Sequence, residues 1–294
     1  MTLALTQHPD MSRLTTLRLG GNALALAVVR GADGLEELGR RLPGLGGKPF
    51  ALGFGSNLLA AGGEAGLTLV QAANVSAPEF LPQDDSKTLV RVGAGFGLPR
   101  LLGLCQRAGL AGLEGLTGVP GRVGGAVAMN AGSYGVEMGQ LIHRVRLWTP
   151  ERGLFWREAA ECGFGYRHFD AGTGSAFTLV WEVELLLASD APAAIRQRME
   201  EVYSKKKATQ PVTAKSAGCV FKNPAGASAG KLLDEAGMKG KRLGGMAFSP
   251  MHANFLVNEG GGTSAQALEL MELGRAAVKR QFGVELQTEV VVLS

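Results

Sequence analysis

The segment LTGVPGRVGGAVAMNAGSYG, residues 116–135, constrains the fold of this chain more than any other stretch. It contains six glycines and one proline, a composition that makes both a poor helix and a poor strand. Four apolar residues, Val119, Val123, Val127 and Met129, nevertheless give it anchors in a core. We therefore predict a folded loop rather than a disordered linker. Its backbone would lie close against a flat or phosphate-bearing ligand.

Glycine is frequent outside this segment too, at 44 of 294 residues, about twice its usual share of roughly 7%. The net charge of +4 is spread along the chain, with no basic stripe interleaved with aromatic residues. A nucleic-acid binder remains possible on charge alone, and small anionic substrates fit equally well. The four histidines are far apart in sequence, so we expect no metal site.

Cysteine usage and hydropathy indicate the cell compartment. Cys105, Cys162 and Cys219 form neither a CxxC pair nor an even set, as is typical of reduced thiols. The first residues lack the pattern of a signal peptide, and there is no apolar run of about 18 residues. We expect a cytoplasmic protein that binds neither a membrane nor an obligate protein partner.

Apolar periodicity predicts an α+β fold in three parts, with domains at 1–78, 79–189 and 190–294. The stretch 76–87, rich in proline and acidic residues, predicts the first boundary. The expected strands are 23–29, 48–54, 88–95, 141–149, 153–158, 176–187, 217–222, 254–258 and 284–293, of which 141–187 would form one antiparallel sheet. The expected helices are 33–42 with an Asp33 cap, 98–109, 192–207, 229–236, and 263–283 with a cap at Thr263 or Ser264 and an end at Gly283.

Three apparent nucleotide motifs do not meet their own requirements. GFGSNL (53–58) and GAGFGL (93–98) end in leucine where a Rossmann fingerprint needs glycine. GASAGKL (226–232) has the wrong glycine spacing for a P-loop and a leucine where Ser or Thr binds magnesium. No GxSxG motif of a serine hydrolase is present. Taken alone, GFGSN is either a turn after a strand or an anion-binding loop of backbone N–H groups.

Seven segments occur in the order found in the UDP-N-acetylenolpyruvoylglucosamine reductases, and the chain resembles that family from about residue 15 to its end. No extra loop interrupts the third part, so the chain resembles the shorter of the family's two forms. The segments are GFGSNLL, GLEGLTGVPGRVGGAVAMNAGSYG, FGYR, AGCVFKNP, AGKLLDEAGMKG, HANFLVN and LQTEV.

The resemblance implies three α+β domains, two forming an FAD-binding unit of the vanillyl-alcohol-oxidase (PCMH) type and one binding substrate. FAD would be non-covalent, because neither glycine loop contains a histidine or cysteine that could tether it. By motif, the cofactor-binding residues would be Gly53, Gly55, Ser56, Asn57, Gly121, Gly124, Gly125, Asn130, Gly132 and Tyr134.

The resemblance also implies the reaction and its residues. NADPH would reduce UDP-N-acetylglucosamine enolpyruvate to UDP-N-acetylmuramate, a step of peptidoglycan precursor synthesis. Arg167 in FGYR and Glu289 in QTEV match the family's catalytic arginine and glutamate. The chain departs from the pattern at Cys219, where the family has a serine, and in HFD after Arg167, where a serine is expected. Tyr166, Lys222 and Asn223 would bind substrate.

Each of these residues also has a plainer interpretation. Arg167 could be a surface ion-pair partner, Glu289 an outward-facing charge and Cys219 a small buried hydrophobe. We interpret His252 as structural and Lys205–Lys207 as a solvated helix end. Two other functions stay open: another flavoenzyme on the same scaffold, such as an oxidase, and a non-catalytic binder of nucleotide sugar or nucleic acid, which would be colourless.

Overall fold

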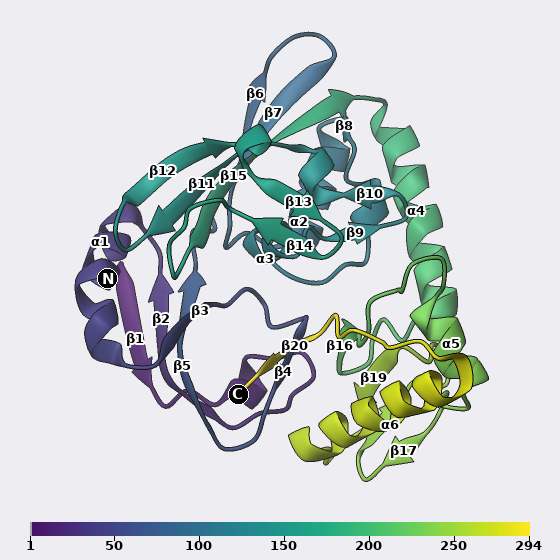
Figure 1. Ribbon diagram of the computed structural model, residues 1–294. Helices are drawn as coiled ribbons and strands as arrows, with labels where there is room; N and C mark the ends of the chain where they lie inside the picture. The colour runs from purple at the N-terminus through teal and green to yellow at the C-terminus, as the bar shows by residue number, and fades with distance from the viewer. Residues whose placement is uncertain (1) are drawn as a thin grey trace. The chain divides into compact units, whose positions relative to one another are not determined.

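The computed structural model describes residues 2–294, which divide into two compact units. Unit 1 comprises the chain up to Gln7, Ala25–Phe54 and Leu67–Lys205, and unit 2 comprises His8–Leu24, Gly55–Gly66 and Lys206–Ser294 (Figure 1). Each has its own hydrophobic core. The α+β class is confirmed, whereas the three domain boundaries stay a prediction. No helix among the described residues is long and apolar enough to cross a membrane.

The first sheet of unit 1 has the strand order β1-β2-β5-β3. It contains β1 (Leu3–Gln7), β2 (Asn22–Val29), β5 (Glu64–Ala72) and β3 (Lys48–Ala51), and α1 (Ala32–Leu45) contacts β1. The predicted strands and helix are confirmed, but the Asp33 cap is wrong. Gly31 occupies the cap position, and Asp33 lies in the first turn, where a carboxylate complements the helix dipole.

The second sheet of unit 1 is antiparallel, as predicted, with strand order β12-β11-β15-β7-β6. These strands are Gly153–Glu158, Ile142–Thr149, Leu179–Ser189, Lys87–Gly93 and Glu79–Pro82 in that order, and β8 (Leu110–Ala111) also pairs with β15. Helix α2 (Leu98–Arg107) is confirmed. The stretch 76–87 is not a bare linker, because β6 lies in it. Proline is tolerated there because β6 is an edge strand.

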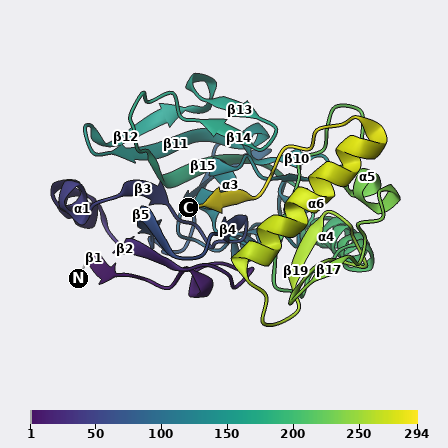
Figure 2. The same ribbon diagram turned by 60° about the horizontal axis from the view of Figure 1, so that its bottom comes forward.

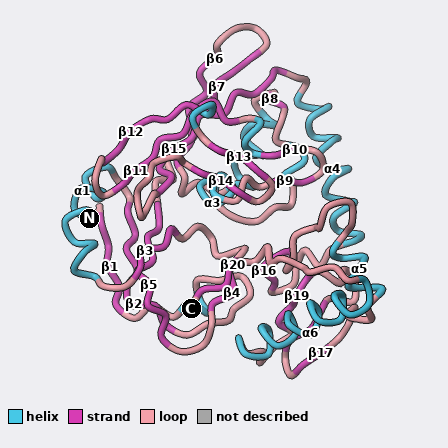
Figure 3. The backbone as a smooth tube through the Cα atoms, viewed as in Figure 1, coloured by secondary structure: helices cyan, strands magenta, loops and turns pink. Residues whose placement is uncertain are grey.

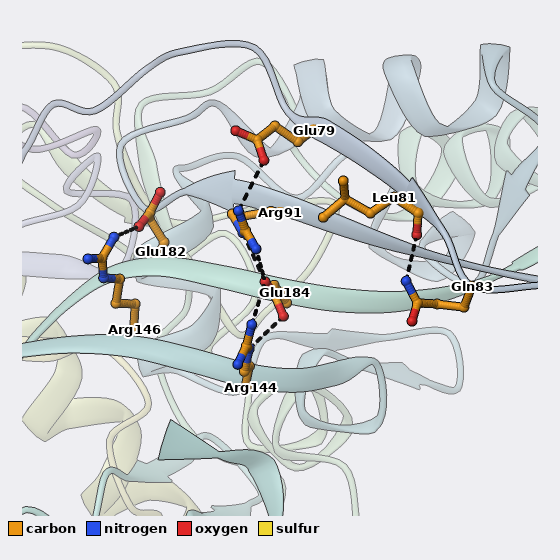
Figure 4. Close-up of polar contacts among 8 residues, drawn as sticks. All are labelled: Glu79, Leu81, Gln83, Arg91, Arg144, Arg146, Glu182 and Glu184. Atoms are coloured by element: carbon orange, nitrogen blue, oxygen red, sulfur yellow. Dashed lines mark hydrogen bonds and ion pairs between the residues drawn. The ribbon is translucent and has the colours of Figure 1, made fainter. Parts of the chain in front are cut away.

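A row of charged side chains links four neighbouring strands of this sheet (Figure 4). Glu184 on β15 is only 1% exposed and accepts hydrogen bonds from Arg91 on β7 and Arg144 on β11. Glu79 on β6 extends the row to Arg91, and the guanidinium of Arg144 lies 4.4 Å from the ring centre of Trp156. Two cations therefore share one buried carboxylate, and their charges stay partly hydrated.

The glycine-rich segment is folded, as predicted, but it contains a helix that its composition did not predict. Helix α3 (Val123–Ala128) lies between loops (Figure 3). Val123, Ala126 and Val127 are buried, and this packing offsets the poor helix propensity of two glycines. Around it lie η2 (Glu114–Leu116), β9 (Gly132–Ser133), β10 (Val136–Glu137) and η3 (Met138–Gln140). After η4 (Ala159–Glu161), strands β13 (Gly163–Gly165) and β14 (His168–Asp170) form a hairpin.

Unit 2 contains a small antiparallel sheet of order β16-β19-β18-β17. Its strands are Ser216–Cys219, Phe255–Asn258, Met246–Phe248 and Arg242–Leu243. Helices α5 (Ala229–Glu235) and α6 (Ser264–Phe282) contact each other, and α6 lies beside β17 and β18 (Figure 2). Thr263 caps α6 in a capping box with Gln266, and Gly283 ends it in a left-handed conformation, as predicted. A single turn, η1 (Met11–Arg13), precedes these elements in sequence.

Two predictions about unit 2 need correction. The expected strand 284–293 is reduced to β20 (Val291–Leu293), which pairs in parallel with β4 (Leu58–Ala60). Helix α4 (Pro192–Thr209) is confirmed, but its lysines are not all solvated. Lys206 is 3% exposed, and burial lowers its pKa to about 8.

Candidate active site

A cavity of about 450 Å³ lies within unit 1, inside the range usual for ligand sites. It is bounded by the end of β3, by α3 and by the segment from β14 to the start of β15. A depression of about 540 Å³ elsewhere in unit 1 contains none of the predicted site residues. The lining of the 450 Å³ cavity is Ala51, Leu52, Gly53, Ala72, Ala94, Arg122, Gly124, Gly125, Ala128, Phe169, Asp170, Ala171, Thr173, Gly174, Ser175, Thr178, Leu179 and Val180.

Gly53 and Gly125 are two of the predicted cofactor residues, and they form a wall of this cavity that consists of backbone only. A Cβ atom on Gly53 would lie 3.5 Å from the Cα of Gly125, so the two backbones run close together. Gly124 is more tightly constrained, because a Cβ there would lie 2.8 Å from the Cβ of Ala94. Its N–H donates to the Ala94 carbonyl at 2.9 Å, which fixes the start of α3. Such a bare wall fits a flat, phosphate-bearing group such as FAD.

Four other predicted cofactor residues, Gly121, Asn130, Gly132 and Tyr134, are not among the described residues that line the cavity. Gly121 has φ +133° and accepts a hydrogen bond from the Leu98 N–H. Tyr134 is 47% exposed and has φ +49°. Their roles at the cofactor stay predictions.

Asn130 is buried and joins three segments of unit 1. Its Nδ2 donates to Glu137 Oε2 at 3.1 Å and to the Gly165 carbonyl at 2.9 Å. Its Oδ1 accepts from the Gly139 N–H at 2.8 Å. Because Gly165 ends β13, Asn130 ties the glycine-rich segment to the hairpin that carries Arg167.

Arg167 occupies the two-residue turn between β13 and β14. Its backbone has φ +55°, a conformation that costs energy in a non-glycine residue and is often found at functional sites. Its Nη2 donates to the Gly132 carbonyl at 3.1 Å, and its guanidinium lies 4.8 Å from the ring centre of Tyr166. The structure therefore brings together predicted residues from the glycine-rich segment and the FGYR motif.

In unit 2, the structure brings Cys219, Glu289 and Asn57 together. Cys219 ends β16 and is half-buried. The next residue, Val220, accepts a hydrogen bond from the Glu289 N–H at 2.8 Å. Asn57 Nδ2 donates to the Glu289 carbonyl at 3.1 Å. The backbone of Glu289 thus links the neighbour of Cys219 to Asn57 of the GFGSN loop.

The remaining predicted residues of unit 2 flank this cluster or the GFGSN loop. The Lys222 N–H donates to the Gln287 carbonyl at 2.8 Å, and Asn223 Oδ1 accepts from the N–H of Ala229 at the start of α5 at 3.0 Å. Gly55, which precedes Ser56, has φ +72°, and a Cβ there would overlap the Leu14 carbonyl. Gly55 is therefore required by local packing as well as by its motif. Arg167 belongs to unit 1, so each unit carries part of the predicted set.

Two parts of the cavity were missed by the sequence analysis. Arg122 lines it, and its Nη1 donates to the Ala72 carbonyl at 3.0 Å. A signal was available, because Arg122 is the one charged residue of segment 116–135. The loop Ala171–Thr178 also lines it, with Gly172 and Gly174 at positive φ. No motif marks that loop.

Comparisons with known proteins match two separate parts of the chain. Residues 45–157 match the model of an FAD binding domain, and residues 210–293 match that of the C-terminal domain of UDP-N-acetylenolpyruvoylglucosamine reductase. The chain is 49% identical over 293 residues to the UDP-N-acetylenolpyruvoylglucosamine reductase of Nitratidesulfovibrio vulgaris, covering 99% of each chain. For the same enzyme of Oleidesulfovibrio alaskensis, identity is 47% and coverage 99% of each. The crystal structure of the reductase from Thermus caldophilus superposes with a TM-score of 0.82 at 34% identity, covering 99% of both chains.

Proposed function

This chain belongs to the UDP-N-acetylenolpyruvoylglucosamine reductase family, and we propose that it reduces UDP-N-acetylglucosamine enolpyruvate to UDP-N-acetylmuramate with NADPH as reductant. The family membership makes it an FAD-binding oxidoreductase of peptidoglycan precursor synthesis. NADPH as reductant, cytoplasmic location and the roles of individual residues are the further parts of this proposal.

The observation that carries the proposal is the backbone of Glu289. Its N–H donates to the carbonyl of Val220, the neighbour of Cys219, and its carbonyl accepts from Asn57 of the predicted cofactor loop. The backbone of one residue therefore links the neighbour of the proposed proton donor, the proposed catalytic glutamate and a loop assigned to the cofactor pyrophosphate. Reduction of an enol ether by hydride and proton needs such a combination.

The chemistry assigns a task to each residue. Bound FAD supplies the transfer of hydride from NADPH to the substrate. When the terminal vinyl carbon receives hydride, the electron pair of the double bond moves toward the neighbouring carboxylate and forms an enolate. Arg167, as a guanidinium, suits the charge that develops on that carboxylate. Glu289 completes the polar surroundings of the enolate.

The carbon bearing the ether oxygen must then receive a proton. We assign that proton to the Cys219 thiol, which stands at the position of the family's serine. Lys222 and Asn223 follow closely in the same motif and are assigned to the nucleotide or its phosphates, and Tyr166 to the substrate beside Arg167. The thiol is restored by a proton from solvent, so one NADPH and one proton are consumed per product.

An anaerobic two-step titration tests the proposal. NADPH should bleach the flavin absorbance band of the purified holoenzyme, and UDP-N-acetylglucosamine enolpyruvate should restore it with formation of UDP-N-acetylmuramate. Bleaching followed by reoxidation with oxygen and an alcohol product, but not with the enolpyruvyl substrate, would identify an oxidase instead. A flavin that NADPH does not bleach would disprove the choice of reductant.

A further inference from the structure

The cavity of unit 1 has very few charges. Among the described residues that line it, Arg122 is the one cation and Asp170 the one anion, and the others are glycine, alanine, larger apolar residues and three hydroxyl residues. Asp170 is already engaged, because its Oδ1 accepts from the Gly172 N–H at 2.8 Å. FAD contributes two negative charges through its pyrophosphate, so the charge of this lining matters for how the cofactor is held.

Arg122 is held in a defined position by backbone. It lies immediately before α3 in an extended conformation, and its Nη1 donates to the Ala72 carbonyl at 3.0 Å. Gly124 and Gly125 of the bare wall follow it two and three residues later. Arg122 and the two close backbones therefore line the same cavity.

The guanidinium of Arg122 is held by a neutral group. Its Nη1 donates to the Ala72 carbonyl, and burial lowers its pKa. Asp170, the one carboxylate among the described lining residues, bonds to the Gly172 N–H. A half-buried cation held by a neutral carbonyl is costly unless an anionic ligand arrives.

We propose that Arg122 binds the pyrophosphate of FAD and thereby selects the phosphorylated cofactor over an uncharged flavin. A guanidinium presents a planar fork of donors that matches phosphate oxygens. One of its nitrogens is anchored on Ala72, so the others meet the pyrophosphate with little loss of conformational freedom. Gly53 and Gly125 shape the wall, and Arg122 supplies its charge.

The test is cofactor binding by the apoprotein rather than turnover. Apoprotein would be prepared from the wild type and from Arg122→Met, Arg122→Lys and Arg275→Met, and titrated with FAD and with riboflavin by flavin fluorescence. Arg275 is the matched control, because it also donates to a backbone carbonyl, that of Leu286, but lies in unit 2. Tryptophan fluorescence reports the folding of unit 1, since Trp148, Trp156 and Trp181 all lie there.

We expect Arg122→Met to raise the Kd for FAD by about 10- to 10²-fold, the range of one lost charged hydrogen bond, and to leave the Kd for riboflavin unchanged. Arg122→Lys should recover part of the FAD affinity, and Arg275→Met should change neither. FAD binding should also weaken less steeply with salt in Arg122→Met than in the wild type. Equal losses of affinity for FAD and riboflavin would mean that Arg122 supports the cavity only through its hydrogen bond to Ala72. An unchanged Kd and salt slope for FAD would overturn the proposal directly.

Discussion

The cavity of unit 1 and the Cys219–Glu289 cluster of unit 2 are built in opposite ways. The cavity has walls of backbone and small side chains, with Gly53 against Gly125. In the cluster, backbone hydrogen bonds hold chemically specific side chains. The cavity is therefore sensitive to added atoms, and the cluster to the loss of a functional group. The proposed function therefore predicts different responses to mutation in the cavity and in the cluster.

The largest effect should come from removing the thiol of the cluster. Cys219→Ala should slow reduction of the enolpyruvyl substrate by about 10²–10⁴-fold, the range for a lost general acid. Flavin reduction by NADPH should stay near the wild-type rate, because it does not use this proton. Stopped-flow absorbance separates the two half-reactions.

The controls for Cys219→Ala are Cys219→Ser and Cys162→Ala. Serine restores a protic group and should recover substantial activity. Cys162 is also half-buried but lies in unit 1, so its loss should affect neither half-reaction. If Cys219→Ala reoxidised its flavin at the wild-type rate, the proton would have to come from another group.

The next largest effects should come from the charged residues. Arg167→Ala should slow flavin reoxidation by substrate about 10²–10³-fold, as for a lost oxyanion donor. Glu289→Gln should slow the same half-reaction, because it removes the charge of the proposed polar neighbour of the enolate. The enolate exists only in that half-reaction, so flavin reduction should be nearly unchanged. Glu285→Gln is the matched control, because Glu285 pairs with Lys279 and both side chains are exposed. Equal slowing of both half-reactions would show a shared binding or folding role.

In the cavity of unit 1, the next prediction adds a side chain rather than removing a functional group, and the expected effect is weaker binding of FAD. A Cβ on Gly125 would meet only the Gly53 Cα, at 3.9 Å, so Gly125→Val should fold and project into the cavity. Fitting FAD beside the added side chain should cost about 1–3 kcal/mol, the range for overpacking. We therefore expect the Kd for FAD to rise about 10- to 10²-fold. Flavin content after purification and titration of the apoprotein measure this effect.

Gly124→Val provides the contrast. Its Cβ would lie 2.8 Å from the Ala94 Cβ, so the chain itself should be destabilised, with a lower thermal midpoint. A Gly125→Val protein that kept stoichiometric FAD at wild-type affinity would remove Gly125 from the cofactor wall.

The features predicted correctly from sequence depend on neighbours along the chain. The capping box and the left-handed glycine of helix α6 lie at its own ends. The strands between residues 141 and 187 could be predicted from the apolar pattern of their own residues. The features missed depend on distant partners. Arg122 is positioned by a carbonyl 50 residues earlier, and helix α3 is stabilised by burial that its composition does not reveal.

The same limit applies to the site residues. Asn130 was predicted as a cofactor ligand by motif, yet its side chain bonds to Gly165, 35 residues away, and ties the glycine-rich segment to the Arg167 hairpin. Lys206 looked like one of three solvated lysines, and only the tertiary structure buries it. A motif identifies the residue, and packing decides what its side chain contacts.

The two units should also differ in how stability depends on pH. Lys206 in unit 2 has its pKa lowered by burial to about 8, so the folded state holds this proton less tightly than the unfolded chain. Burying the charged Lys206 side chain costs its full free energy below pH 8. This cost decreases as the pH rises toward about 10.4, the pKa of lysine in the unfolded chain. The free energy of unfolding of Lys206→Met relative to wild type should therefore fall by about 1–3 kcal/mol between pH 7 and 10.5. Urea unfolding followed by circular dichroism measures this, and a constant difference would contradict it.

The smallest effect concerns Glu184 in the sheet of unit 1, and its sign is opposite. Burial alone would raise the pKa of Glu184, but hydrogen bonds and charges from Arg144 and Arg91 outweigh it, and the pKa lies below its usual value. A carboxylate whose pKa is lowered by folding stabilises the folded state at pH values above about 4.3, the pKa of glutamate in the unfolded chain. This contribution is lost as the pH falls through the pKa of the folded state. Glu184→Gln should therefore lower the free energy of unfolding by about 1–2 kcal/mol at pH 7, because both arginines are about one-third exposed and stay hydrated. The difference from wild type should shrink as the pH falls through the lowered pKa of folded Glu184, where the wild-type carboxylate is protonated as well. Tryptophan fluorescence during urea unfolding reports this change in unit 1. If the loss of stability in Glu184→Gln persisted undiminished in acid, packing at Glu184 rather than its charge would stabilise this sheet.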